Sequence, residues 1–146
     1  LHLSLRRQRQ MCIRDRHYAD HKIFSHECIE YTRHLNFTSG NAFKYLYRQG
    51  QKFNTQEDIN KAIWYIQDEF SHINPVMSIP DNLVIEMKKE LDSYVDNQGI
   101  DLEQYSIENV DNKDIIIGYI MVEIASSSFF DLSQRELSQR LVEKLS

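Results

Sequence analysis

The chain of 146 residues is long enough to form one domain with a hydrophobic core, and its hydrophobic content of 41% excludes disorder throughout. Four glycines and two prolines are few, which favours long elements over a sandwich of short strands. We therefore expect an all-α domain of about five to six helices. The longest apolar run, residues 115–125, is too short to span a bilayer, so we expect no membrane partner and a cytoplasmic location.

Charge is unevenly distributed along the chain. Residues 1–16 hold five arginines and one aspartate, 5 − 1 = +4, and the remainder holds twelve basic and twenty-one acidic residues, 12 − 21 = −9. The stretch Arg6–Arg16 has no periodicity and no helix cap, and it looks like translated sequencing-adapter DNA. We therefore expect residues 1–16 to be an artefact or a disordered arm. Residues 17–146 are then a single acidic helical domain, with parts 17–72 and 80–146, that is not expected to bind duplex nucleic acid.

Apolar side chains recur at helical spacing along most of the chain. One stripe predicts a helix over residues 20–35, and its members are Phe24, Cys28, Tyr31 and Leu35. Thr38 or Ser39 is expected to cap the next helix. Similar spacing, with capping and stop residues at the ends, predicts further helices over residues 41–49, 55–72, 80–97 and 133–145.

The segment between residues 100 and 130 is less regular. Residues 100–110 are expected to form a loop or a short helical turn. The β-branched run 115–117 favours a strand, whereas the length of the segment 111–130 and its small residues favour a helix. We expect a helix that is apolar nearly all round, and that is therefore buried in the core or at a subunit interface.

The helix over residues 41–49 has two unlike faces. At about 100° per residue, one face carries an amide, a phenol and two cations, namely Asn41, Lys44, Tyr45 and Arg48. Lys44 and Arg48 are one turn apart, so both can reach a single phosphate group. Because the opposite face is apolar and packs, we expect Lys44→Ala or Arg48→Ala to weaken anion binding with little change in folding.

The following helix carries a matching polar set beside its apolar stripe, formed by Asp58, Lys61 and Tyr65. If the two helices pair antiparallel through a short turn, Lys61 joins the phosphate clamp. Tyr45, Tyr65 or Trp64 can then stack on a base. Asp58 either pairs with a lysine or accepts a hydrogen bond from a sugar or base.

Residues 17–70 resemble a family of small phage domains that includes the nucleotide kinase of the T-odd coliphages. The resemblance rests on a His-Tyr pair, a Gly-Asn-x-x-Lys-Tyr-x-x-Arg helix and a Glu-Asp-x-x-Lys-Ala-x-x-Tyr helix. It implies nucleotide or deoxynucleotide binding by a homo-oligomer in the cytoplasm of an infected bacterial host, with ATP as the phosphoryl donor of a kinase. The residues that it implicates are His17, Tyr18, Asn41, Lys44, Tyr45, Arg48, Asp58 and Lys61.

Two functions fit this constellation best. The resemblance implies a nucleoside monophosphate kinase. No Gly-x-x-x-x-Gly-Lys-Ser/Thr motif is present, which excludes a Walker-type kinase, so phosphoryl transfer would depend on positioning and on cationic stabilisation. The alternative is a non-catalytic protein that sequesters a nucleotide, such as a cyclic nucleotide signal of host antiviral defence. An isolated basic patch on an acidic body fits that role.

A third function is an all-α nucleotide pyrophosphohydrolase. Glu27 and Glu30 share a helical face and would hold magnesium. The second carboxylate pair, at residues 68–69, lacks the Glu-x-x-Asp spacing of such enzymes, so we expect no metal site. The histidines at positions 21, 26 and 72 are expected at the surface.

Overall fold

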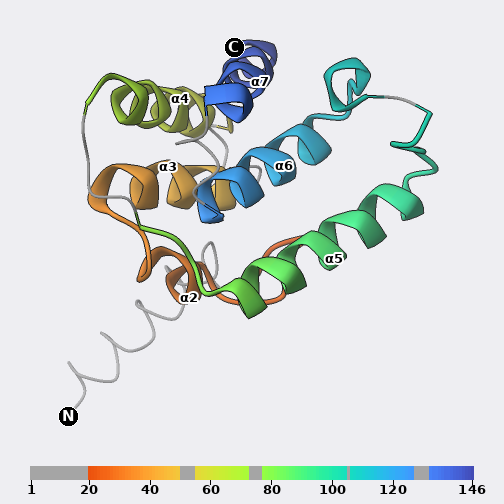
Figure 1. Cartoon of the computed structure of the whole chain (residues 1–146), viewed down its shortest axis with the longest axis horizontal. Helices are drawn as coiled ribbons and strands as arrows, with labels where there is room; N and C mark the ends of the chain where they lie inside the picture. Colours follow the sequence, from red (N-terminus) through yellow and green to blue (C-terminus); the bar gives the residue numbers. More distant parts are fainter. Residues whose placement is uncertain (1–19, 50–54, 73–76, 105, 127–131) are drawn as a thin grey trace, which may run out of the picture.

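The computed structural model describes residues 20–49, 55–72, 77–104, 106–126 and 132–146, and this part of the chain is helical, without strands (Figure 1). The predicted all-α fold is therefore confirmed. The elements are α2 (Cys28–Thr32), α3 (Phe37–Arg48), α4 (Thr55–Ser71), α5 (Asp81–Asn97), the 3₁₀-helix η1 (Ile107–Asn109), α6 (Lys113–Ala125) and α7 (Leu132–Leu145).

Helices α3 and α4 form an antiparallel hairpin, the most extensive helix pair of the described chain. Helix α6 packs against α3, α5 and α7, and Figure 1 shows it between the hairpin and α5. All six described α-helices contribute buried apolar side chains to one common core. Helices α3 and α4 turn Phe43, Leu46, Ile59 and Ile66 into this core, which leaves their outer faces for polar and aromatic side chains.

Helix α6 is apolar around its circumference, and ten of its thirteen residues are buried. The strand alternative for this segment is wrong, because burial on all sides outweighs the β-branching of Ile115–Ile117. Asn112 caps the helix by accepting from the backbone N–H groups of Asp114 and Ile115. No helix in the described part of the chain is both long and apolar enough to cross a membrane.

The predicted helix over residues 20–35 is largely wrong, because only Cys28–Thr32 is helical. The preceding backbone donates its hydrogen bonds to side chains instead. The N–H groups of Ile23 and Phe24 bond to Nδ1 of His21, and the N–H of Ser25 bonds to a carboxylate oxygen of Glu90 on α5 at 2.6 Å. The four residues of the predicted stripe are nevertheless buried, so the apolar pattern identified the core but not the backbone conformation.

Helix α3 begins at Phe37, four residues before its predicted start, and neither Thr38 nor Ser39 caps it. Asn36 is the cap, and its Oδ1 accepts from the N–H of Ser39 at 2.8 Å. The other side of the same amide donates to Oε1 of the buried Glu69 at 3.0 Å. One side chain therefore closes the helix and joins the far ends of α3 and α4.

We expect Asn36→Ala to lower the free energy of unfolding by about 2 kcal/mol, because it removes a helix cap and a hydrogen bond to a buried carboxylate. Asn36→Ser, which keeps a capping oxygen but cannot reach Glu69, should recover about half of that loss. Chemical denaturation of the parent and both variants measures these changes in the free energy of unfolding. Equal stability of the alanine variant and the parent would contradict the capping role.

The remaining elements agree with the sequence. Helices α4 and α5 lie within a residue of their predicted bounds, and η1 is the expected helical turn. Helix α7 begins at Leu132, one residue before its prediction. The side chain of Ser133, the capping residue predicted at its start, lies outside the described residues, as does the N-terminal arm of residues 1–16.

Candidate functional site

The outer face of the α3–α4 hairpin brings together the polar residues singled out in the two helices. The ring of Tyr45 is the centre of the group. Nζ of Lys44 lies 4.6 Å from the ring centre, Cζ of Arg48 lies 5.2 Å from it, and Nζ of Lys61 lies 5.5 Å from it. These distances are typical of cation–π contacts. We call Lys44, Arg48 and Lys61 around Tyr45 the cation cluster.

Arg48 is held by Asp58 across the hairpin. Its Nη2 donates to Oδ1 of Asp58 at 2.5 Å, and the two side chains are only 16% and 4% exposed. Of the roles open to Asp58 in the sequence, the structure assigns a pairing role, although with an arginine and not with a lysine. Asp58 is therefore a positioning residue that fixes the guanidinium beside Tyr45.

The two lysines of the cation cluster differ in their partners. Nζ of Lys61 pairs with Oε1 of Glu57 at 3.0 Å, one turn earlier on α4, and this hydrogen bond raises the pKa of Lys61. Among the residues that the structure describes, no carboxylate pairs with Lys44. The cluster and its two carboxylates thus sum to 3 − 2 = +1, a charge suited to a small anion.

Aromatic rings continue the site towards the start of α3. Tyr65 stacks beside Tyr45 with its ring centre 6.0 Å away and the planes 15° apart. Phe37 meets Tyr65 edge-on at 6.3 Å, and Trp64 does so at 5.1 Å. Phe37 is 78% exposed and Trp64 is 61% exposed, an unusual state for large apolar rings. We call Phe37, Trp64 and Tyr65 the aromatic end.

Phe37 was missed in the sequence because the helix was predicted to start at residue 41, which left Phe37 outside it. The signal was present in the spacing. Counted from Phe37, the polar residues of this helix follow at i+4, i+7, i+8 and i+11, and these spacings place all five side chains on one helical face: Phe37, Asn41, Lys44, Tyr45 and Arg48. Asn41 also lies on this face, where its Nδ2 donates to the carbonyl of Phe37 at 2.7 Å. His17 and Tyr18 lie outside the described residues.

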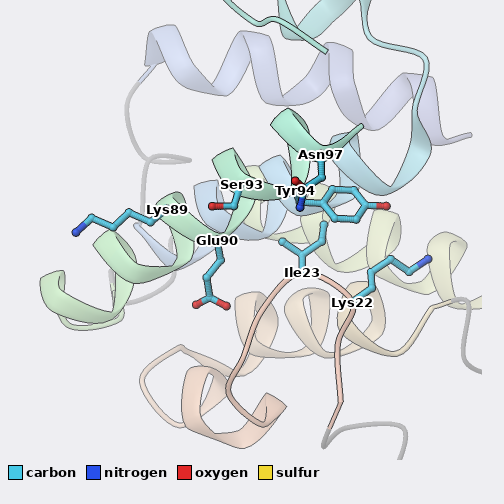
Figure 2. A pocket seen from close by; sticks show the side chains of 7 residues that line it. All are labelled: Lys22, Ile23, Lys89, Glu90, Ser93, Tyr94 and Asn97. Carbon is cyan, nitrogen blue, oxygen red and sulfur yellow. The ribbon is translucent and has the colours of Figure 1, made fainter. Parts of the chain in front are cut away.

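A hollow of about 340 Å³ lies elsewhere, between α5 and the segment before α2 (Figure 2). Figure 2 shows the side chains of Lys22 and Lys89 extending in opposite directions, so their ammonium groups do not converge. Lys22 is paired with Asp114 at 3.1 Å, and Glu90 is bound to Ser25. We therefore place the candidate site on the hairpin and not in this hollow.

The carboxylates proposed for a hydrolase do not gather into a metal site. Glu30 pairs with Arg33 at 3.2 Å. Within the described ranges, no group of three or more His, Cys, Asp or Glu side chains could hold a metal ion. The buried Cys28 has its pKa raised to about 12 by burial, so its thiol stays protonated at neutral pH.

Comparison with known proteins gives one match. Residues 14–67 match the model of a family described as a protein of unknown function, DUF3310. The match begins inside the segment 1–16 and spans α2, α3 and most of α4, and so includes the cation cluster and the aromatic end. Neither the search of curated proteins nor that of solved structures found a match.

Proposed function

We propose that the protein binds a nucleotide by its phosphate at the cation cluster. The observation that carries the proposal is the convergence of three cations on Tyr45, from two helices, within 5.5 Å of one ring centre. Arg48 supplies planar donors that Asp58 holds in place, and Lys44 supplies a charge with no carboxylate partner in the described chain. This combination of guanidinium and ammonium groups is typical of phosphate recognition.

Two further features support a nucleotide as the ligand. Exposed aromatic rings are joined to the cation cluster through Tyr65, which stacks beside Tyr45, and such rings stack on bases. The same two helices carry the motifs that resemble the phage nucleotide kinase domain. The excess of one positive charge favours a small phosphate ester over a polyanionic strand.

We expect Lys44→Ala and Lys61→Ala to weaken nucleotide binding by about 1.5–3 kcal/mol each, roughly 10- to 150-fold in Kd, because each removes a charge-assisted hydrogen bond. Glu57→Gln should tighten binding about twofold, since it releases Lys61 from a surface ion pair. Isothermal titration with a panel of nucleoside monophosphates, cyclic nucleotides and ATP measures these effects.

The matched control is Lys88→Ala, which removes an exposed lysine of α5. If no nucleotide of the panel binds, or if the control weakens binding as much as the two cluster variants do, the proposed function is wrong.

A measurement of turnover distinguishes a nucleotide kinase from a protein that only sequesters a nucleotide. Incubation with a nucleoside monophosphate and ATP yields a nucleoside diphosphate if the protein is a kinase. A nucleotide that copurifies with the protein, is released unchanged on denaturation and is not converted indicates sequestration. Only the kinase requires a second nucleotide subsite beside the first.

A further inference from the structure

The candidate site has two chemically different ends. Along α3, Phe37 and Lys44 are seven residues apart on one face, about 10 Å along the helix axis. Along α4, the aromatic pair Trp64 and Tyr65 lies three and four residues beyond Lys61, so the rings are next-turn neighbours of that cation. Cations therefore occupy one end of the hairpin face and exposed rings occupy the other.

Tyr45 is not available as the base-stacking ring, although it is central to the site. Three cations already approach its ring, and Tyr65 stacks beside it. Its π-electrons hold the phosphate-binding cations together. Phe37 and Trp64 are in a different situation, because each touches Tyr65 edge-on and keeps most of its surface in solvent.

We infer that the aromatic end is the base subsite, so that the ligand is a nucleotide of low charge, with one planar base on Phe37 and Trp64 and one phosphate at the cation cluster. The inference rests on the proposed function and adds to it the orientation and the class of the ligand. Tyr65 links the two subsites, since its ring contacts both Tyr45 and the two exposed rings.

The charge of the site supports the same ligand class. The cation cluster has an excess of one positive charge after its two carboxylates are counted. That excess is closer to the charge of a single phosphate group, about −1.5 to −2 at neutral pH, than to the charge of a di- or triphosphate. The exposed rings lie within about two helical turns of that charge, a separation that one nucleoside can bridge. A sugar phosphate or inorganic phosphate would leave the rings uncovered and would gain nothing from them.

The chain contains one tryptophan, so its fluorescence reports directly on the aromatic end. We expect a nucleoside monophosphate to quench Trp64 emission on binding. Ribose 5-phosphate and inorganic phosphate should bind at least tenfold more weakly and leave the emission unchanged. Phe37→Leu and Trp64→Leu, measured by calorimetry, should each weaken nucleotide binding about 5- to 100-fold, the effect of losing one base–ring stack.

Ile85→Ala on α5 is the control for loss of an exposed apolar side chain, because Ile85 is 53% exposed, and it should leave affinity unchanged. The inference is overturned if nucleotide and ribose 5-phosphate bind equally well, or if both leucine variants bind like the parent while Lys44→Ala weakens binding. If only the leucine variants bind like the parent, the inference is wrong but the proposed function stands. If no nucleotide binds at all, both the inference and the proposed function are wrong.

Exposed rings can also form a contact between copies of the chain. Light scattering on the same variants tests this alternative, because it measures the mass of the particle. If Phe37→Leu or Trp64→Leu lowers the mass of the particle without changing nucleotide affinity, the aromatic end is an interface between copies and the inference is wrong. An unchanged mass with lost affinity is the expected result.

Discussion

Replacing Asp58 with alanine is expected to lower the free energy of unfolding by about 3 kcal/mol. The substitution leaves the guanidinium of Arg48 nearly buried and without its 2.5 Å carboxylate partner across the hairpin. Breaking a buried ion pair costs about 3–5 kcal/mol, because the remaining charge is not solvated. The lower end applies here, since 16% of the Arg48 side chain is exposed. Urea denaturation at neutral pH measures the change.

Glu57→Ala is a closely matched control for that substitution. Glu57 precedes Asp58 in the first turn of α4, so both carboxylates interact similarly with the helix dipole. Glu57 is 55% exposed, however, and its ion pair with Lys61 is worth at most about 1 kcal/mol. Equal destabilisation by the two substitutions would show that the Arg48–Asp58 pair contributes nothing beyond a surface charge.

Because of the same pair, we expect Arg48→Ala to affect folding as well as binding, in place of the little change in folding predicted from the sequence. The face opposite Arg48 does pack, as predicted, but Arg48 itself neutralises a carboxylate that is 4% exposed. We therefore expect the removal of Arg48 to destabilise the hairpin as well as the cation cluster. Lys44, which has no such partner in the described chain, is therefore the better residue for testing binding alone.

Stability is also expected to fall by about 2 kcal/mol between pH 7 and pH 5 because of His21. Its Nδ1 accepts the backbone N–H groups of Ile23 and Phe24 at 3.1 and 3.3 Å, which requires that nitrogen to be unprotonated. The ring packs against Phe24 and Tyr47. Burial lowers the pKa of His21 from 6.5 to about 4, with a further lowering by Lys22 that Asp114 partly offsets.

The sign follows from proton uptake by the unfolded chain. Above pH 6.5 the imidazole is neutral in both states and does not affect stability. Between pH 6.5 and about pH 4, the unfolded chain binds a proton that the folded protein rejects, so folding becomes less favourable as the pH falls. At 1.36 kcal/mol per pKa unit, the loss reaches at most about 2 kcal/mol at pH 5.

His21→Asn isolates this effect, because the Oδ1 of asparagine can accept the same N–H groups and does not titrate. The free energy of unfolding of parent and variant is compared at pH 7 and pH 5. We expect the difference between them to shift by about 2 kcal/mol in favour of the variant at the lower pH. A difference that does not change with pH would refute the assignment of a partly buried, neutral imidazole.

His21 was expected at the surface and is in fact partly buried. A histidine in an irregular segment carries no sequence signal of how far neighbouring elements cover it.

Much of the site could be read from periodicity. Lys44, Tyr45 and Arg48 were predicted to share a face, and Asp58, Lys61 and Tyr65 were predicted to oppose them. Helical spacing determines which side chains of one helix point the same way, and a short connection favours an antiparallel pair. The structure brings these six residues together on the hairpin, as expected.

By itself, the sequence determined the helical class, the buried nature of α6 and the polar face of the hairpin, because these depend on residue spacing within one element. Only the tertiary structure decided which groups are paired and which are exposed. The burial of the Arg48–Asp58 pair, the irregular backbone around His21 and the exposure of Phe37 all depend on neighbours distant in the chain. At Ser25 and Asn36, hydrogen bonds to Glu90 and Glu69 determine the local structure in place of local backbone preferences. These acceptors belong to other helices, so residue spacing within one helix could not predict them.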